Sequence, residues 1–176
     1  MDLVVRFENG SWRANCGPAS YACAIGRAGV VAAEDKREGD GATPLGAWPV
    51  REIRHRPDRV ASVECVLPTA PISPDDGWCD DPGESAYNRP VKLPFAGSHE
   101  RMWRDDGLYD LVCVLGHNDD PPRPGMGSAI FLHCAGEGLP PTAGCVALAR
   151  GDLQRVLSQF REGDRVVVEP PATAAN

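Results

Sequence analysis

The sequence predicts a mostly β protein with one or two helices, arranged as a β-sandwich or a barrel-like sheet. Glycine and proline are frequent, with 19 and 17 residues among 176, against a combined background of about 12%. Short apolar runs lie between these turn-forming residues, a pattern typical of strands joined by tight turns or ordered loops. Only one segment, close to the C-terminus, shows the period of an amphipathic helix.

The expected strands follow from these apolar runs. We expect them at residues 3–7, 21–25, 30–33, 48–53, 109–115, 129–132 and 165–168. Gly26 and Gly29 predict a tight turn that joins the second of these strands to the third. The run at 129–132 ends at His133, which places this histidine at the mouth of a loop.

A helix is expected at residues 151–160. Its apolar side chains recur at the i, i+3, i+4 and i+7 positions, and they are Leu153, Val156, Leu157 and Phe160. Residues 34–46 and 68–90 are rich in turn-forming and charged residues and predict loops, of which the second is long and ordered. Residues 99–104 are compatible with one or two helical turns.

Composition limits the classes of function. The chain has 18 basic and 25 acidic side chains and a formal net charge of -7, whereas a nucleic-acid-binding protein needs a basic face. No stretch approaches the ~18 apolar residues of a membrane-spanning helix, and no signal peptide is visible at the N-terminus. We therefore expect one soluble, monomeric domain over residues 1–169, a flexible tail at 170–176, and neither a nucleic-acid partner nor a membrane span.

Seven cysteines are scattered along the chain, and no C-x-x-C pair occurs among them. The missing spacing argues against a zinc ribbon or a thioredoxin-like site, and we expect neither a metal nor an organic cofactor. Free cysteines mostly behave as small buried apolar residues. Because their number is odd, at least one thiol stays outside any intramolecular pair.

The stretch 128–149 carries the residues best suited to chemistry. His133 ends a strand, and Cys145 follows in the motif T-A-G-C. A cysteine nucleophile needs a nearby base, because the free thiol is mostly protonated at neutral pH. Each residue alone is more often part of a packed core, but two such residues at loop mouths of one β-loop-β unit make a Cys–His catalytic site an equally good interpretation.

This stretch resembles a known family. G-S-A-I-F-L-H and T-A-G-C-V-A-L, followed by a helix, look like the catalytic end of the L,D-transpeptidase (YkuD-like) domain. Upstream, G-A-T-P-L-G resembles the T-P-x-G segment of that family, and D-G-W-C-D-D-P-G-E-S-A-Y-N-R-P-V and L-G-H-N-D-D-P-P-R-P-G-M-G resemble a compact bacterial branch of it. The resemblance covers about residues 20–160 and implies the β-sandwich or barrel-like catalytic domain of the family.

The resemblance also implies residue roles. Cys145 would be the nucleophile, at a surface cleft, and His133 its base. Gly144 and the amide of Cys145 are the expected oxyanion donors, because a small residue lets backbone N–H groups approach the substrate. Thr142 would orient the loop or contact the substrate, unless it only forms the turn.

The chain departs from the family at two positions beside the nucleophile. Ala143 stands where the family commonly has histidine, and Ala147 stands where it often has Arg or Asn. Two residues further away are candidates for the same site. His117, in G-H-N, would form a second rim or else a structural contact, and Arg89 would pair with a substrate carboxylate or else be solvated.

Other conspicuous side chains favour structural interpretations. Trp78 and Trp103 are expected to cover the core rather than to bind glycan. The acidic residues Asp75, Asp76, Asp80 and Asp81 lack the spacing of a calcium loop and are expected to be solvated.

The implied activity is acyl transfer through a thioester on peptidoglycan stem peptides, which makes cross-links. The donor bond follows either the diamino acid at position three or L-Ala at position one of the stem. Three alternatives stay open: a muropeptide amidase or L,D-carboxypeptidase with the same Cys–His pair, an inactive peptidoglycan-binding module, and a structural zinc protein. The family's function implies the periplasm or cell envelope, while the absence of a visible signal peptide leaves the cytoplasm open.

Overall fold

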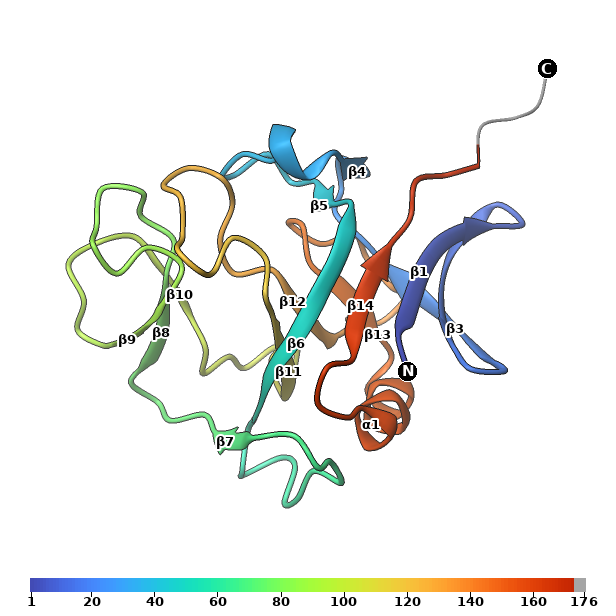
Figure 1. Ribbon diagram of the computed structural model, residues 1–176. Helices are drawn as coiled ribbons and strands as arrows, with labels where there is room; N and C mark the ends of the chain where they lie inside the picture. Colours follow the sequence, from blue (N-terminus) through green and yellow to red (C-terminus); the bar gives the residue numbers. More distant parts are fainter. Residues whose placement is uncertain (173–176) are drawn as a thin grey trace.

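The computed structural model describes residues 1–172, most of them in short strands and ordered loops (Figure 1). The strands are β1 (Leu3–Glu8), β2 (Ser11–Cys16), β3 (Ala19–Ala24), β4 (Val30–Val31), β5 (Thr43–Pro44), β6 (Gly46–His55), β7 (Thr69–Pro71), β8 (Asp76–Cys79), β9 (Pro90–Lys92), β10 (His99–Arg101), β11 (Leu111–Leu115), β12 (Phe131–Cys134), β13 (Val146–Leu148) and β14 (Arg165–Val168). The helices are a 3-10 turn, η1 (Ala33–Asp35), and α1 (Arg150–Gln159). Of the tail expected at 170–176, residues 173–176 lie outside the described residues.

The main sheet closes on itself. Its strand order is β11-β12-β13-β3-β2-β1-β14-β6-β7, and β11 also pairs with β6. This extra pairing joins the two sides of the sheet into a barrel and leaves β7 as an added strand on β6. The predicted class, mostly β with a barrel-like sheet, is confirmed.

The interior of the barrel is apolar and is completed by α1. Leu153, Val156, Leu157 and Phe160 are all 0% exposed and belong to the same buried cluster as the strand residues Leu3 and Ile53. The helix lies at one end of the barrel, below β13 and β14 in Figure 1. The periodicity of the sequence therefore identified both the helix and its buried face.

A second apolar cluster lies between the sheet and the long excursion that runs from β7 to β10. Trp78 is buried there, and its ring meets Phe131 edge-on at 5.1 Å between centroids. Trp103 packs against the same cluster, with the Arg56 guanidinium 3.5 Å from the centre of its ring. Both tryptophans cover the core, as expected.

The structure corrects several expected elements. Residues 99–104 form no helical turn, because β10 pairs antiparallel with β8 and extends a small sheet of β10, β8 and β9. The expected loop 68–90 contains β7 and β8. The strand at 30–31 does not form a hairpin with β3, because both edges of β3 are already paired, with β2 and with β13, and β4 pairs with β5 instead.

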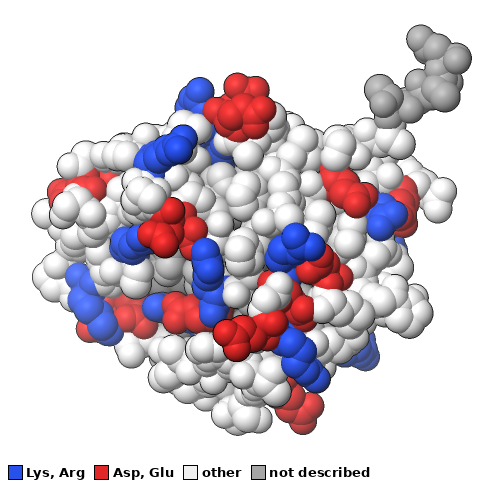
Figure 2. All heavy atoms as spheres, in the orientation of Figure 1, with Lys and Arg blue, Asp and Glu red and all other residues white. Residues whose placement is uncertain are grey.

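Charged side chains of both signs are interspersed on the face seen in Figure 2. Ion pairs of the protein include Arg51 with Asp119 at 2.7 Å and Arg54 with Glu52 at 2.7 Å. Within residues 1–172, no helix is both long and apolar enough to cross a membrane.

Candidate active site

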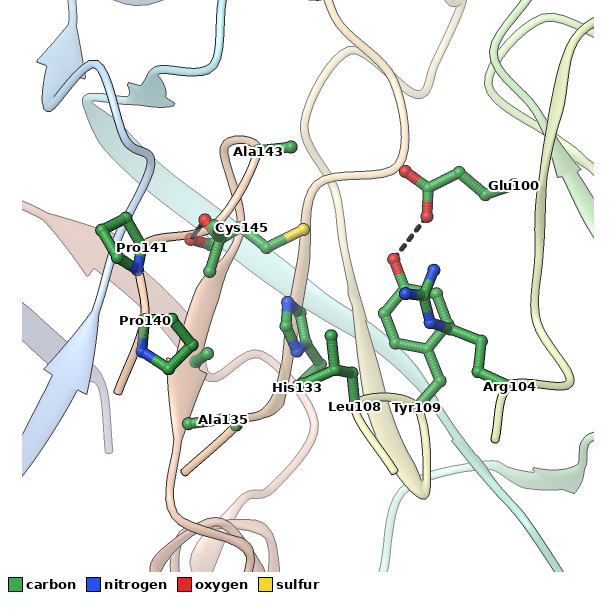
Figure 3. Close-up of a pocket in the computed structure, with 13 residues that line it drawn as sticks. Glu100, Arg104, Leu108, Tyr109, His133, Ala135, Pro140, Pro141, Ala143 and Cys145 are labelled. Atoms are coloured by element: carbon green, nitrogen blue, oxygen red, sulfur yellow. Dashed lines mark hydrogen bonds between the residues drawn. The ribbon is translucent and has the colours of Figure 1, made fainter. Parts of the chain in front are cut away.

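A cavity of about 220 Å³ opens between β12, the loop after it and the segment that leads into β11. Four of the residues singled out in the sequence line it: His133, Thr142, Ala143 and Cys145 (Figure 3). Ala147, the second departure from the family pattern, also lines the cavity.

Strand register explains why Cys145 and His133 meet. β12 and β13 run parallel, with Leu132 opposite Val146 and His133 opposite Ala147. Cys145 immediately precedes β13 and is level with Phe131, whose N–H donates to its Sγ at 3.3 Å. Because side chains alternate between the two faces of a sheet, Cys145 and His133 project into the same cavity.

The Cys145 thiol is enclosed. The residue is only 7% exposed, so it lies deeper than the open surface cleft expected from the sequence. Its Sγ donates to the carbonyl oxygen of Ala129 at 3.2 Å. Burial, with a smaller contribution from the charge of Glu100, raises the pKa of the thiol to about 12.

The bonding of His133 fixes which ring nitrogen is free. Nδ1 lies 2.8 Å from the carbonyl oxygen of Cys134. A carbonyl only accepts hydrogen bonds, so Nδ1 carries the proton and the neutral ring keeps Nε2 unprotonated. Figure 3 shows one ring nitrogen of His133 directed toward the Cys145 sulfur.

The environment keeps this imidazole uncharged at neutral pH. Burial lowers the pKa of His133 to about 4, against a smaller opposing effect of the hydrogen bond to Cys134. The ring of Tyr109 packs on it edge-on, with 5.3 Å between centroids. The resting site therefore contains a neutral thiol and a neutral imidazole, so a nucleophilic attack by this sulfur would require a coupled proton transfer.

A short turn shapes the backbone before the thiol. Gly144 has a φ of 139°, and a Cβ there would lie 2.9 Å from the carbonyl oxygen of Ala42. Its N–H donates to Thr142 Oγ1 at 3.1 Å, and this hydroxyl donates to the Cys145 carbonyl at 2.6 Å. Thr142 thus holds the turn, and the Gly144 N–H is engaged within it rather than open to the cavity. The Cys145 amide is the other expected oxyanion donor.

Thr43 supports the turn from a different part of the chain. Its Oγ1 accepts a hydrogen bond from the N–H of Gly26 at 2.8 Å and donates to the Cys145 carbonyl at 3.5 Å. Thr43 belongs to the T-P-L-G segment that resembles the family, but that segment alone indicated no role for its hydroxyl.

The wall opposite the Cys–His pair consists of residues that were not expected at the site. Tyr109 Oη donates to Glu100 Oε2, and the Arg104 guanidinium lies 5.0 Å from the centre of the Tyr109 ring (Figure 3). Arg104 also donates from Nε to Asp106 at 3.1 Å. Burial raises the pKa of Glu100. Glu100 and Arg104 lie in the segment that the sequence assigned to helical turns, so no motif marked them.

The structure does not bring His117 and Arg89 to this cavity. His117 is edge-on to Trp48 at 4.7 Å between centroids, and its Nε2 lies 3.1 Å from the carbonyl oxygen of Met126. Arg89 donates to the carbonyl oxygens of Asn88 and Asp119. Both side chains connect neighbouring loops, and neither is among the residues that line the cavity.

The acidic residues near β8 serve the local fold. Asp75 and Asp76 pair with Lys92 at 2.9 and 2.7 Å. Asp81 accepts hydrogen bonds from the N–H groups of Gly83 and Ser98 at 2.9 and 3.2 Å. In the part of the chain that the structure describes, no group of three or more His, Cys, Asp or Glu residues is arranged to hold a metal ion.

A closed β domain that places one cysteine beside one histidine fits the class of cysteine acyltransferases. The family model of the YkuD L,D-transpeptidase catalytic domain matches residues 3–168. The chain therefore belongs to the YkuD L,D-transpeptidase family, whose members act on peptidoglycan and usually work in the cell envelope. No curated protein and no solved structure matches the chain.

Proposed function

We propose that residues 1–169 form a monomeric catalytic domain that makes peptidoglycan cross-links by L,D-transpeptidation, with Cys145 as nucleophile and His133 as base. The observation that carries the proposal is the pairing of an enclosed thiol with a histidine whose unprotonated nitrogen is Nε2, in one cavity. The site of action is the cell envelope, where the substrate lies.

The chemistry divides into two half-reactions. The Cys145 sulfur attacks the carbonyl of an L-residue that precedes a D-residue, while His133 Nε2 takes the thiol proton. The C–N bond breaks, His133 returns the proton to the departing amine, and a thioester remains. A second amine then attacks the thioester, the C–S bond breaks, and the thiol is regenerated. The Cys145 amide stabilises the oxyanion in both steps, and the reaction uses no metal or organic cofactor.

The lining of the cavity bears on which bond is the donor. Ala143 and Ala147 present methyl groups where a charged side chain of the donor would need polar partners, and Pro140 and Pro141 continue this apolar wall. The wall favours the donor with the smaller side chain, L-Ala at position one, over the diamino acid at position three. Incubation with purified tetrapeptide muropeptides, followed by tandem mass spectrometry, distinguishes them. A dimer joined through L-Ala supports position one, and release of D-Ala alone indicates position three.

Labelling with a carbapenem tests the nucleophile. Intact-mass spectrometry should show one adduct on the wild type and none on C145A or C145S, because the acyl-enzyme needs this thiol. C65A is the matched control and should keep the adduct, since Cys65 lies outside the cavity and is only half-buried. An adduct that persists on C145A would overturn the assignment.

Product analysis separates the remaining activities. With an amine acceptor present, a transpeptidase yields a new amide, whereas an amidase or carboxypeptidase yields only the hydrolysed acid from the same thioester. An inactive binding module yields no adduct at all.

A further inference from the structure

The side chain of Asn88 uses its full hydrogen-bonding capacity inside the protein. Its Nδ2 group donates to the carbonyl oxygens of His117 and Asn118 at 3.1 and 2.7 Å. Its Oδ1 accepts from Trp78 Nε1 at 2.9 Å and from the N–H of Ala129 at 3.0 Å. An amide side chain has two donor hydrogens and two acceptor lone pairs, so all four are occupied. Asn88 is only 4% exposed and is therefore fixed in one orientation.

One of these contacts acts on a backbone segment with an unusual conformation. Ala129 has a φ of 52°, in the left-handed region where a Cβ crowds the backbone. Such a conformation persists only where surrounding contacts fix it. A rotation about this φ would turn the Ala129 N–H away from Asn88 Oδ1. The neighbouring Ser128 hydroxyl donates to Glu38 at 2.7 Å, so a second contact attaches the segment to the rest of the protein.

The same segment holds the sulfur of Cys145 at two points. The carbonyl oxygen of Ala129 accepts from Sγ at 3.2 Å, and the N–H of Phe131 donates to Sγ at 3.3 Å. Neither Asn88 nor Ala129 is among the residues that line the cavity. The backbone conformation at Ala129 thus determines in which direction the S–H group of Cys145 points.

We propose that Asn88 is a positioning residue, which fixes the left-handed conformation of Ala129 and thereby the hydrogen-bonded orientation of the Cys145 thiol. The orientation can be measured without any substrate, and only its kinetic consequence rests on the proposed function. Without Asn88, the sulfur occupies several positions, of which only some face His133 and a bound carbonyl. The expected consequence is slower acylation at an unchanged affinity for the substrate.

Infrared spectroscopy of the S–H stretch tests the orientation directly. The band of a thiol lies at lower wavenumber when its hydrogen is donated to an acceptor. Subtracting the spectrum of C145A from that of the wild type isolates the band of Cys145, and N88A minus N88A/C145A gives the same band in the variant. We expect it to move to higher wavenumber in N88A, because the Ala129 carbonyl is no longer held in place. An unmoved band would overturn the inference.

Asn118 provides the matched control. It also has a positive φ, of 48°, and its side chain also connects loops, with Nδ2 donating to the carbonyl oxygens of Arg123 and Gly127 at 3.0 and 2.9 Å. N118A keeps the backbone carbonyl that Asn88 contacts. It should therefore lose loop contacts of the same kind and still show the wild-type Cys145 band.

A second variant, N88D, decides the question even where N88A does not fold. Its carboxylate still accepts from Trp78 and from the N–H of Ala129, but it no longer donates to the two loop carbonyls. The Cys145 band should stay at its wild-type position in N88D. A band displaced to higher wavenumber in N88D would show that the contact with Ala129 does not orient the thiol.

Single-turnover acylation by a carbapenem measures the kinetic consequence. The dependence of the rate on carbapenem concentration gives the apparent Kd and the maximal rate separately. N88A should lower the maximal rate at least about tenfold and leave the Kd within about twofold, because Asn88 does not line the cavity. N118A should keep both values. Molecules that fail to fold do not acylate, so they reduce the amplitude and not the rate.

The outcomes separate this inference from the proposed function. Equal maximal rates in N88A and the wild type would overturn the role of Asn88 as a positioning residue. A wild type that forms no acyl-enzyme would overturn the proposed function, and the infrared comparison would still decide whether Asn88 orients the thiol.

Discussion

His133 and Cys145 are both uncharged in the folded protein, and the neutral histidine lowers the stability of the fold at acidic pH. Burial lowers the pKa of His133 to about 4 and raises that of Cys145 to about 12. The unfolded chain takes up a proton on the histidine below its ordinary pKa of about 6.5, but the folded protein does not. The free energy of unfolding that depends on His133 is therefore fully present above pH 6.5 and lost as the pH falls toward 4.

A histidine variant makes this loss measurable. Between pH 7.5 and 4.5, wild type should lose about 2–3 kcal/mol of stability more than H133Q, which cannot titrate. Urea unfolding of each protein at both pH values measures its loss of unfolding free energy between them. Equal losses in the two proteins would mean that the imidazole is accessible to solvent and keeps an ordinary pKa.

Gly144 shows how one missing side chain permits the shape of the turn before Cys145. A Cβ there would lie 2.9 Å from the carbonyl oxygen of Ala42, at a φ of 139° that other residues rarely adopt. G144A should cost at least about 1–3 kcal/mol and should also slow acylation of Cys145. The matched control is G138A in the same loop, with a φ of 76° but no atom within 4 Å of its Cβ.

These two variants separate the effect of a positive φ, which both positions have, from that of a steric clash, which only Gly144 has. G138A should lose about 1–2 kcal/mol of unfolding free energy but keep the wild-type rate of acylation. This rate is measured by quenching the reaction with a carbapenem at set times and recording the intact mass. If both variants acylate at the wild-type rate, the turn before Cys145 does not need its observed geometry for catalysis.

At the scale of elements, the segment around β5 braces the nucleophile turn from outside. Thr43 contacts both Gly26 N–H and the Cys145 carbonyl, and the N–H of Arg27 donates to the Thr142 carbonyl at 2.9 Å. The turn before Cys145 is therefore held by a strand about a hundred residues earlier in the chain.

Replacing the Thr43 hydroxyl tests this brace. T43V keeps the shape of the side chain but leaves the buried Gly26 N–H without its partner, and it should cost about 1–3 kcal/mol of unfolding free energy. T69V, at an exposed position on β7, should change stability by less than about 0.5 kcal/mol. Thermal unfolding of the two variants compares them; similar losses would show that Thr43 contributes no particular support.

Local patterns predicted the elements whose apolar run or helical period is clear in the sequence. The helix at 151–160 and the strand at 165–168 match α1 and β14 closely. β2 was missed because its side chains, S-W-R-A-N-C, show no clean alternation, although Asn9-Gly10, both with positive φ, is the turn that favours a hairpin. The error at 99–104 has another cause: β10 exists because β8 offers it an edge, which no local pattern shows.

At the scale of the whole molecule, the cavity is assembled from segments far apart in the chain. The motif around Cys145 and His133 pointed to the side of the site that one β-loop-β unit builds. Glu100, Arg104 and Tyr109 come from the excursion and the segment before β11, and only the closed sheet brings them opposite the thiol. His117 and Arg89 were candidates for the site, with a structural contact and a solvated side chain as the alternatives. The loops that carry them pack against each other, away from the cavity.

Within the closed sheet, β1 pairs with β14 from the other end of the domain, with Leu3 opposite Val166. During synthesis, β1 emerges before β14 and stays without this partner until the later strand has been made. Proteins dominated by such distant pairings fold in milliseconds to seconds rather than microseconds. Until then one edge of β1 has unpaired backbone groups, and such an edge can pair with strands of other chains. Nascent chains are thus at greatest risk of aggregation before β14 has been synthesised. Slower production or added chaperone capacity should raise the yield of folded protein.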